Sequence, residues 1–219
     1  MIRDIVSMLL PLLLTASILA DDKSEPASEP GFASLFDGKT LDGWEGDVQG
    51  YEVVDGAIAC KEKGGGFLYT AKEYGDFAFR VEFKLTPGAN NGIGIRTPKN
   101  ANPAYAGMEI QVLDDTSDKY KSIKDYQRHG SIYGVAPAKT GHLKPIGEWN
   151  SQEIICKGKQ VQVILNGETI IDADIEKAST PNTVDEKDHP GLKRDQGYIC
   201  FCGHGAHVEF RNIRVKELK

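Results

Sequence analysis

The chain has 219 residues, of which 40% are hydrophobic, 26% charged and 8% aromatic, and its formal net charge at pH 7 is −6. This composition is that of an ordinary globular protein, and it excludes collagen-like, low-complexity and wholly disordered chains. The sequence has no basic stripe interleaved with aromatic residues, so nucleic acid is not expected as a partner. The length suits one all-β domain with a substantial core.

Residues 1–20 have the pattern of a secretory signal peptide. Arg3 precedes an apolar run that ends at the small residue Ala20, which suits a cleavage site. A core helix or a membrane anchor is the alternative, but Pro11 and the acidic residues after the run fit an anchor poorly, and the run is short for a bilayer span. We therefore expect an exported protein, periplasmic or extracellular, with no membrane span after signal cleavage.

Residues 21–31 (DDKSEPASEPG) are polar and contain proline, which is typical of a flexible linker. In the rest of the chain, residues 32–219, turn residues recur at short intervals and no repeat period is visible. We predict that residues 32–219 form a single domain.

A hydrophobic period of two is the main signal in this domain. In Asp76–Leu85 (DFAFRVEFKL) apolar and polar side chains alternate, as in a half-buried strand. Gln160–Leu165 repeats the pattern and ends at Asn166-Gly167, a strong hairpin signal. Further strands are predicted, in chain order, at Tyr51–Cys60, Gly92–Arg96, Met108–Leu113, Ser131–Val135, Glu153–Lys157, Ile170 onward, Gly197–Cys202 and His207–Val215, with one short helical turn near Asp115–Lys124. Many short strands separated by turns predict an all-β sandwich of the jelly-roll kind.

The strand phases predict which side chains share the face of a sheet that points away from the core. If Met108, Ile110 and Val112 face the core, Glu109 and Gln111 must point the other way. The same reasoning places on such a face Gly92, Gly94, Arg96, Tyr198, Cys200, Cys202 and His204. The glycines would leave a floor with little side-chain bulk, where a ligand could approach the backbone. Such a face is either solvated or lines a cleft, and the pattern alone favours solvation.

Segments spread over nearly the whole domain carry a resemblance to known proteins. In chain order they are FASLFDGKTLDGW (Phe32–Trp44), NNGIGIRTP (Asn90–Pro98), YAGMEIQVLDD (Tyr105–Asp115), HGSIYGVAPAKTGHLKPIGEWN (His129–Asn150), LNG (Leu165–Gly167) and GHGAHVEFRNIRVKEL (Gly203–Leu218). In these segments the chain resembles the 3-keto-disaccharide hydrolase family, mostly exported bacterial proteins with a concanavalin-like (lectin-like) jelly-roll fold. Many members have a Gln two residues before the His of the final motif, where this chain has Cys202, which puts a sugar contact by that Gln in question.

The resemblance implies cleavage of a glycoside whose sugar ring is already oxidised to a ketone at C3. The ketone acidifies the hydrogen on C2, so a base can form an enolate that expels the glycosidic oxygen from C1, after which water adds. This route needs a base, a stabiliser for the enolate oxygen and a proton donor for the leaving group. It does not need the paired carboxylates of ordinary glycosidases. We predict a hydrolase of 3-keto-glycosides, acting directly or by elimination and hydration.

Glu109, His204 and His129 are the predicted catalytic residues. Glu109 lies in the EIQVLDD motif and points away from the core, which suits a base or a metal ligand, and an exposed strand Glu is the alternative. The two histidines lie in family motifs and suit an acid, base or ligand role. His189 and His207 are interpreted as surface or structural residues.

A second set of residues is predicted to bind the substrate, namely Arg96, Gln111, Asp114, Tyr133, Glu148 and Asn150. Arg96 would contact an oxyanion or a hydroxyl group, with a structural ion pair as an equal alternative. Gln111 would hydrogen-bond sugar hydroxyls. Asp114 stands at a strand end, where capping or turn formation explains it as well. Tyr133, like Tyr105, could stack on a sugar ring or pack in the core.

The participation of a divalent metal stays open, because the sequence contains no tight metal motif, although one His with two carboxylates would be a conceivable ligand set. The four cysteines, Cys60, Cys156, Cys200 and Cys202, permit disulfides in an exported protein. Cys200 and Cys202 would share one strand face, where mutual bridging is awkward, and this favours buried free thiols. The sequence does not indicate an oligomeric state.

Two other function classes remain open at this point. One is a non-catalytic carbohydrate-binding jelly-roll module of the cell envelope, and the other is a structural or partner-binding sandwich. A pure binding module would favour aromatic platforms, whereas the predicted face carries Glu109, Gln111, Arg96 and His204. A structural sandwich predicts no cleft and no convergence of these four side chains.

Overall fold

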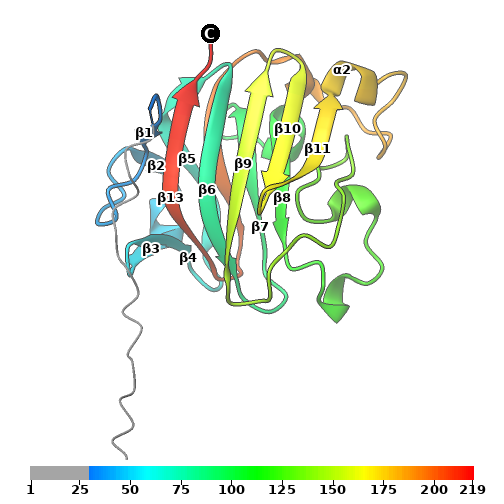
Figure 1. Cartoon of the computed structure of the whole chain (residues 1–219). Coiled ribbons are helices and arrows are strands. Elements are labelled where there is room, and N and C mark those ends of the chain that lie inside the picture. The colour runs from blue at the N-terminus through cyan, green and yellow to red at the C-terminus, as the bar shows by residue number, and fades with distance from the viewer. Residues whose placement is uncertain (1–29) are drawn as a thin grey trace, which may run out of the picture.

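The computed structural model describes residues 30–219, which form two antiparallel β-sheets packed face to face (Figure 1). The large sheet consists, in spatial order, of β11 (Glu168–Asp174), β10 (Gln160–Leu165), β9 (Trp149–Lys157), β6 (Phe77–Leu85), β13 (Val208–Glu217), β4 (Ala57–Cys60) and β3 (Tyr51–Val54), with β1 (Ala33–Ser34) paired to β13. The small sheet consists of β2 (Trp44–Gly46), β5 (Gly65–Tyr74), β12 (Gly197–His204), β7 (Asn90–Thr97) and β8 (Met108–Leu113). The prediction of an all-β sandwich is confirmed.

The helices of the described chain are short. They are α1 (Pro103–Ala106), α2 (Ile175–Ala178) and single 3-10 turns at Val48–Gly50, Asp118–Tyr120, Asp125–Gln127 and Pro190–Lys193. Within residues 30–219, no helix is long and apolar enough to cross a membrane. The predicted signal peptide, residues 1–20, lies outside the described residues.

The predicted β10–β11 hairpin is confirmed. Asn166 and Gly167 both adopt positive φ angles, 51° and 90°, as a tight two-residue turn requires. The helical turn expected near residues 115–124 forms at Asp118–Tyr120. The strand predicted at Ser131–Val135 is wrong, because Ile132 N–H donates to the Ala136 carbonyl and closes a tight turn, which leaves only isolated bridges.

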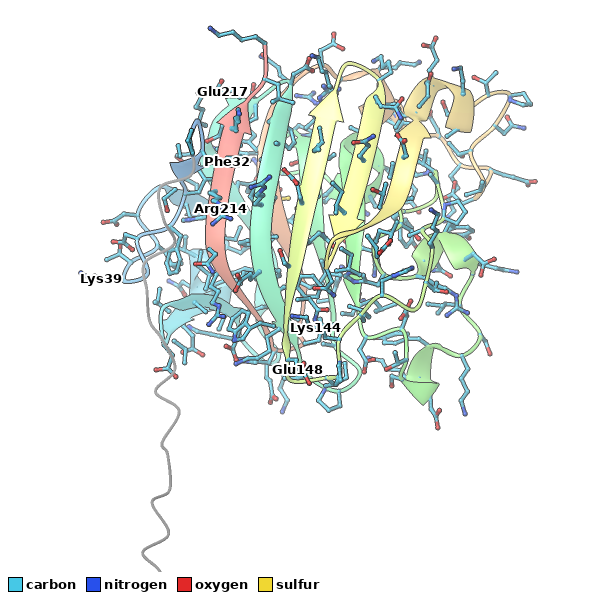
Figure 2. All side chains as sticks on the ribbon, in the orientation of Figure 1. Phe32, Lys39, Lys144, Glu148, Arg214 and Glu217 are labelled. Atoms are coloured by element: carbon cyan, nitrogen blue, oxygen red, sulfur yellow. The ribbon has the colours of Figure 1, made fainter. Side chains whose placement is uncertain are left out.

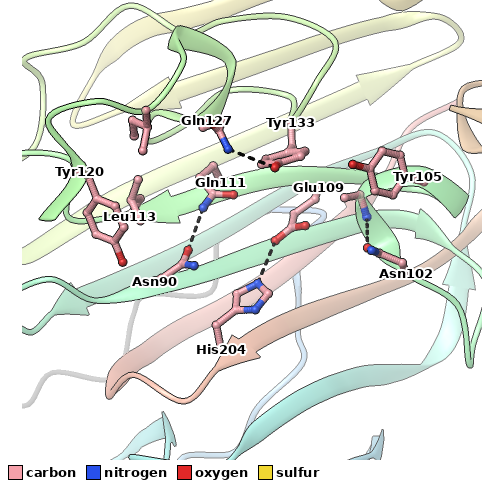
Figure 3. A pocket seen from close by; sticks show the side chains of 12 residues that line it. Asn90, Asn102, Tyr105, Glu109, Gln111, Leu113, Tyr120, Gln127, Tyr133 and His204 are labelled. Carbon is pink, nitrogen blue, oxygen red and sulfur yellow. Dashed lines mark hydrogen bonds and ion pairs between the residues drawn. The ribbon is translucent and has the colours of Figure 1, made fainter. Parts of the chain in front are cut away.

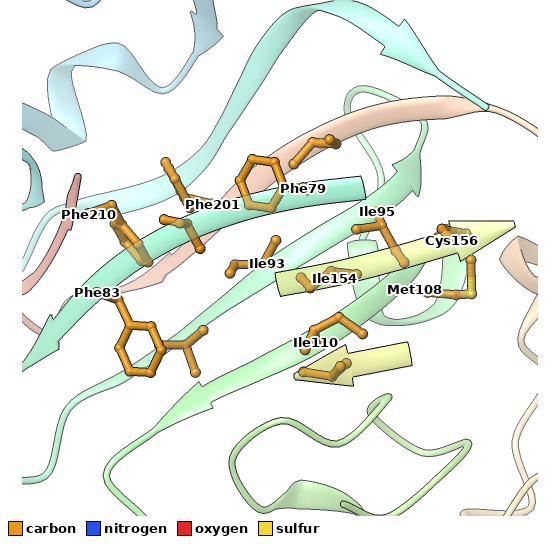
Figure 4. Packing of buried hydrophobic residues seen from close by; sticks show 14 of the residues in the cluster. Phe79, Phe83, Ile93, Ile95, Met108, Ile110, Ile154, Cys156, Phe201 and Phe210 are labelled. Carbon is orange, nitrogen blue, oxygen red and sulfur yellow. The ribbon is translucent and has the colours of Figure 1, made fainter. Parts of the chain in front are cut away.

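The core lies between the two sheets and has the composition that the period-two pattern predicts (Figure 4). From the small sheet, Ile93, Ile110 and Phe201 point inward and are fully buried. Phe201 stacks on Phe210 of β13 with ring centroids 3.9 Å apart, which joins the two sheets near one end of the core. Each such side chain contributes about 1.5–3 kcal/mol by leaving water. The side chains that alternate with them therefore lie on the outer faces.

Arg96 departs from that alternation, and its predicted substrate contact is wrong. It has a φ of 49° beside a register shift between β7 and β12, and its side chain is only 1% exposed. The guanidinium donates to the carbonyls of Gly75 (3.0 Å), Gly158 (2.8 Å) and Arg194 (3.3 Å) and to Asp76 Oδ1 (2.8 Å). Arg96 thus ties together three chain turns at the end of the sandwich, which is the structural alternative to substrate binding.

Replacing Arg96 by Met should destabilise the fold strongly. The substitution keeps the apolar stem but removes the guanidinium donor of three carbonyls and the charged partner of Asp76, which costs about 3–5 kcal/mol of unfolding free energy. Urea unfolding followed by tryptophan fluorescence measures the change. Lys72→Met is the matched control, because both side chains of the Lys72–Glu217 ion pair are 60% exposed and water screens their attraction, so its loss should barely change stability. Equal losses in the two variants would contradict the role given to Arg96.

Candidate active site

A pocket of about 280 Å³ opens on the outer face of the small sheet (Figure 3). Strands β7 and β8 form its floor, His204 at the end of β12 lies on one side, and α1 and the loops after β8 lie on the other. The lining residues are Asn90, Asn102, Ala104, Tyr105, Glu109, Gln111, Leu113, Tyr120, Ile123, Gln127, Tyr133 and His204. The pocket therefore brings together four of the predicted site residues, Glu109, Gln111, Tyr133 and His204.

The Glu109 carboxylate occupies the space that a side chain at Gly92 would fill on the pocket floor. Strands β7 and β8 pair so that Gly92 faces Gln111 and Gly94 faces Glu109. A Cβ atom on Gly92 would lie 2.0 Å from Glu109 Oε1, a distance that no side chain can occupy. The space beside Gly92, which the sequence predicted to be open to a ligand, is thus filled by the carboxylate of Glu109 on the neighbouring strand.

The Glu109 carboxylate is buried and incompletely hydrogen-bonded. Its side chain is 7% exposed, and Oε1 accepts no hydrogen bond from residues 30–219. The nearest opposite partner is His204 Nε2 at 3.7 Å, which is too long for a hydrogen bond. Because an unmet buried acceptor is costly, a hydrogen-bond donor brought by a ligand would be bound favourably at this oxygen. The arrangement suits a general base with an imidazole beside it.

Amide and phenol groups surround the carboxylate. Gln111 Nε2 donates to Asn90 Oδ1 at 2.8 Å, and Gln127 Nε2 donates to the Tyr133 phenol oxygen at 3.2 Å. The backbone N–H of Tyr133 donates to the Glu109 carbonyl at 2.9 Å, which fixes the aromatic residue beside β8. The lining thus offers several hydrogen-bond donors and acceptors to the hydroxyl groups of a sugar.

Sequence reasoning missed part of this lining. Asn90 has the same strand phase as Gly92 and Gly94, so extending the β7 pattern by two residues would have found it. Asn102, Tyr120 and Gln127 come from irregular segments and short helices, where no periodicity indicates direction.

His129 lies outside the pocket, and its predicted catalytic role is wrong. Its side chain is buried against Phe83 of the large sheet, with ring centroids 5.1 Å apart, and Nδ1 accepts from the Leu113 N–H at 3.3 Å. Burial lowers the pKa of His129 to about 4, and the neighbouring Gln152 side chain offsets this only in part. His129 is a neutral core histidine that completes the end of β8.

Asp114 also serves the fold instead of the substrate. It is 2% exposed, and its oxygens accept from the Gly88 N–H at 2.7 Å and from the Thr116 hydroxyl at 2.6 Å. Asp114 thus has the turn-forming role that the sequence analysis gave as the alternative to substrate binding.

Glu148 and Asn150 belong to the other sheet, so their predicted substrate contacts are wrong. Figure 2 shows Glu148 at the lower end of the large sheet, where its side chain is exposed. Asn150 is buried, and its Oδ1 accepts from the Lys144 N–H and from Asn166 Nδ2, both at 2.9 Å. Membership of a family motif misled here, because Asn150 lies in β9 of the opposite layer and Glu148 lies just before that strand.

The cysteines are free thiols in the structure, and all four are buried. Cys200 and Cys202 lie on the outer face of β12 with their sulfur atoms 3.7 Å apart, in a small cluster with Tyr69, Phe67 and Tyr198. In the described part of the chain, no three His, Cys, Asp or Glu side chains converge as a metal-binding group.

A larger hollow of about 570 Å³ lies beside α2 and residues 181–193. Its lysines and acidic residues are mostly exposed. Both ring nitrogens of its buried His189 already have partners at 3.0 Å, the Ala104 carbonyl and Asp185 Oδ1. The smaller pocket, which a buried carboxylate lines together with an imidazole, amides and phenols, is therefore the better candidate for chemistry.

Comparison with known proteins identifies the family. A family model described as a 3-keto-alpha-glucoside-1,2-lyase-like domain matches residues 31–216. The chain belongs to this family. A Bacteroides thetaiotaomicron protein named 3-keto-disaccharide hydrolase is 30% identical to it over 238 aligned positions, which cover 90% of this chain and 82% of that protein. The resemblance inferred from the sequence motifs is thereby confirmed.

Solved structures agree with this assignment. A crystal structure of a candidate glycosyl hydrolase from Parabacteroides distasonis has a TM-score of 0.75 and 28% identity, covering 85% of this chain and 99% of that one. A Bacillus subtilis protein described as having a galectin-like fold has a TM-score of 0.51 at 13% identity, covering 80% of this chain and 88% of that one, which shows the fold alone. The family and these relatives support a glycoside-cleaving enzyme on a jelly-roll scaffold.

Replacing Gly92 by Ala should damage the pocket more than the fold. The added methyl group would push the Glu109 carboxylate off its position, since the two would be 2.0 Å apart. We expect a loss of activity comparable to that of removing the carboxylate, roughly 10²–10⁴-fold, with a cooperative unfolding transition retained. Gly75→Ala is the matched control, because Gly75 is not among the glycines with a positive φ and a Cβ there would come no nearer than 3.3 Å to any atom, the Asp195 carbonyl oxygen. Full activity in Gly92→Ala would contradict the placement of Glu109.

His129 should make stability depend on pH in a defined window. Its folded pKa of about 4 lies below the ordinary value of 6.5, so the unfolded chain binds the proton first as the pH falls. Stability is fully present above pH 6.5 and is lost as the pH falls through about 4, by about 3 kcal/mol in total. In His129→Asn, which keeps an acceptor for the Leu113 N–H, unfolding curves between pH 7 and 4 should lack this part of the slope. Parallel curves for the two proteins would contradict the assignment.

Proposed function

We propose that this protein cleaves the glycosidic bond of 3-keto-glycosides by removing the proton at C2. The observation that carries the proposal is the buried, unsatisfied Glu109 carboxylate, which is the one acidic side chain among the described lining residues. Ordinary glycosidases need two carboxyl groups on either side of the bond. A pocket with one carboxylate and several neutral donors fits a single proton abstraction better.

The pocket holds groups for the first step of the reaction, the formation of the enolate. Glu109 takes the C2 proton, and the electrons of that bond form an enolate with the C3 ketone. Tyr133 donates to the enolate oxygen, because its own oxygen accepts from Gln127 Nε2, a nitrogen that only donates, and its hydroxyl hydrogen is left free. His204 lies beside the carboxylate, with Nε2 at 3.7 Å from Oε1. Gln111 and Asn90 bind ring hydroxyls.

The descriptions of the family and of one relative support two successive reactions, an elimination and a hydration. Elimination would release the alcohol and leave a sugar with a C1=C2 double bond, as the lyase description of the family implies. Addition of water across that bond would give the product of hydrolysis, as the name of the Bacteroides thetaiotaomicron relative implies. We infer the same order of events for this chain, and the signal-like residues 1–20 support export as its setting.

The proposal is tested by assaying release from methyl 3-keto-glucoside and from its unoxidised parent. The wild type should cleave the keto compound alone, with a primary isotope effect when C2 carries deuterium. Glu109→Gln should lower kcat/KM by roughly 10³–10⁴-fold, and His204→Ala by roughly 10²-fold. Each assay is repeated with a chelator, because sensitivity to it would reveal a metal ion at the site.

Glu148→Gln is the matched control, because it removes an exposed carboxylate on the other sheet and should leave the rate unchanged. Binding of the sugar without release, unaffected by Glu109→Gln, would replace the enzyme by a carbohydrate-binding module. Cleavage of the unoxidised parent at the same rate would exclude the C2-proton route.

A further inference from the structure

Tyr105 is a second phenol at the pocket, and its environment differs from that of Tyr133. In Figure 3, Tyr105 and Tyr133 lie across Glu109 from His204. The Tyr105 oxygen accepts from Lys187 Nζ at 3.0 Å, whereas the Tyr133 oxygen accepts from the uncharged Gln127 amide. An ammonium group has donors and no acceptor. The hydroxyl hydrogen of Tyr105 must therefore point away from Lys187, and it is free to be donated in the pocket.

A folded loop holds Lys187 in this place. The Lys187 N–H donates to Asp185 Oδ1 at 3.1 Å, and the same oxygen faces His189 Nε2 at 3.0 Å. The His189 ring packs against Tyr105 with ring centroids 4.9 Å apart, and its Nδ1 faces the carbonyl of Ala104, the residue before Tyr105. Residues 185–189 are therefore fixed against helix α1, and this holds Lys187 next to Tyr105.

The charge at Lys187 suits a phenol that gives up its proton. The hydrogen bond with Tyr105 is the largest cause that raises the pKa of Lys187 above its ordinary value, so the side chain stays charged at neutral pH. A positive charge in hydrogen-bond contact stabilises negative charge that develops on the phenol oxygen. The Tyr133 oxygen feels the charge of Lys187 without a hydrogen bond to it, and its hydrogen-bond partner is the neutral Gln127 amide. The two tyrosines are thus suited to different tasks.

Building on the proposed function, we propose that Tyr105 is the proton donor to the departing glycosidic oxygen and that Lys187 is a positioning residue that stabilises the resulting phenolate. As the enolate collapses to the ketone, the C1=C2 bond forms and the C1–O bond breaks. The leaving oxygen takes the hydroxyl proton of Tyr105. Water then gives its hydroxyl group to C1 and its proton to the phenolate, and Glu109 returns its proton to C2. Both residues end in their starting states.

The test compares a poor leaving group with a good one. Methoxide must be protonated as it leaves, whereas 4-nitrophenolate leaves unaided. In Tyr105→Phe, kcat/KM for methyl 3-keto-glucoside should fall by roughly 10²–10⁴-fold, while that for 4-nitrophenyl 3-keto-glucoside stays within about fivefold. Tyr133→Phe is the matched control, since loss of a donor to the enolate oxygen should slow both substrates by a similar factor.

Lys187 separates the positioning role from a merely structural one, because its side chain is exposed and its loss should not impair folding. Lys187→Met should slow the methyl glycoside by roughly 10–100-fold and spare the nitrophenyl glycoside. Lys187→Arg should restore most of the rate. If Tyr105→Phe slows both substrates equally, or neither, the assignment of the acid is overturned. If the wild type cleaves neither substrate, the proposed function itself fails.

Discussion

The chemistry of the pocket depends on the close packing of a carboxylate against a glycine. Glu109 can lie flat on the small sheet because Gly92, on the neighbouring strand, has no side chain where Oε1 sits. Burial in that position removes the carboxylate from water and supplies no hydrogen bond to Oε1 in return. Such a group is costly for folding. The large core between the sheets offsets this unfavourable contribution to the free energy of folding.

A single carboxylate in a pocket of amides and phenols restricts the reactions that the site can support. Direct displacement at C1 would need a second carboxyl group on the other face of the sugar. Proton abstraction next to a ketone needs one base and donors placed where negative charge appears. The charge would move from C2 to the enolate oxygen and then to the leaving oxygen, and Tyr133 and Tyr105 give the pocket a separate phenol for each oxygen.

The sequence predicted the outward direction of Glu109 and Gln111 because strand alternation is strict within β8, where every inward position is apolar. Alternation failed at Arg96, where a positive φ and a register shift turn the side chain from the outer face into a buried network. It also gave no information on His129, which lies in an irregular segment. Motif membership alone assigned Glu148 and Asn150 to the site. Which sheet a motif joins depends on strand pairing between distant segments, and a single sequence does not reveal that pairing.

Cys202 lies on the same face of the small sheet as Glu109, and its side chain is fully buried. Burial raises the pKa of Cys202 well above its ordinary value, and the adjacent Cys200 and the charge of Glu109 add to the effect. The thiol therefore stays neutral and does not compete with Glu109 as a nucleophile or base. A Gln at this position would bring an amide donor close to the carboxylate, whereas a thiol is only a weak donor. Cys202 thus leaves Glu109 Oε1 without a strong donor from β12, and in the proposed reaction that oxygen stays available to the substrate.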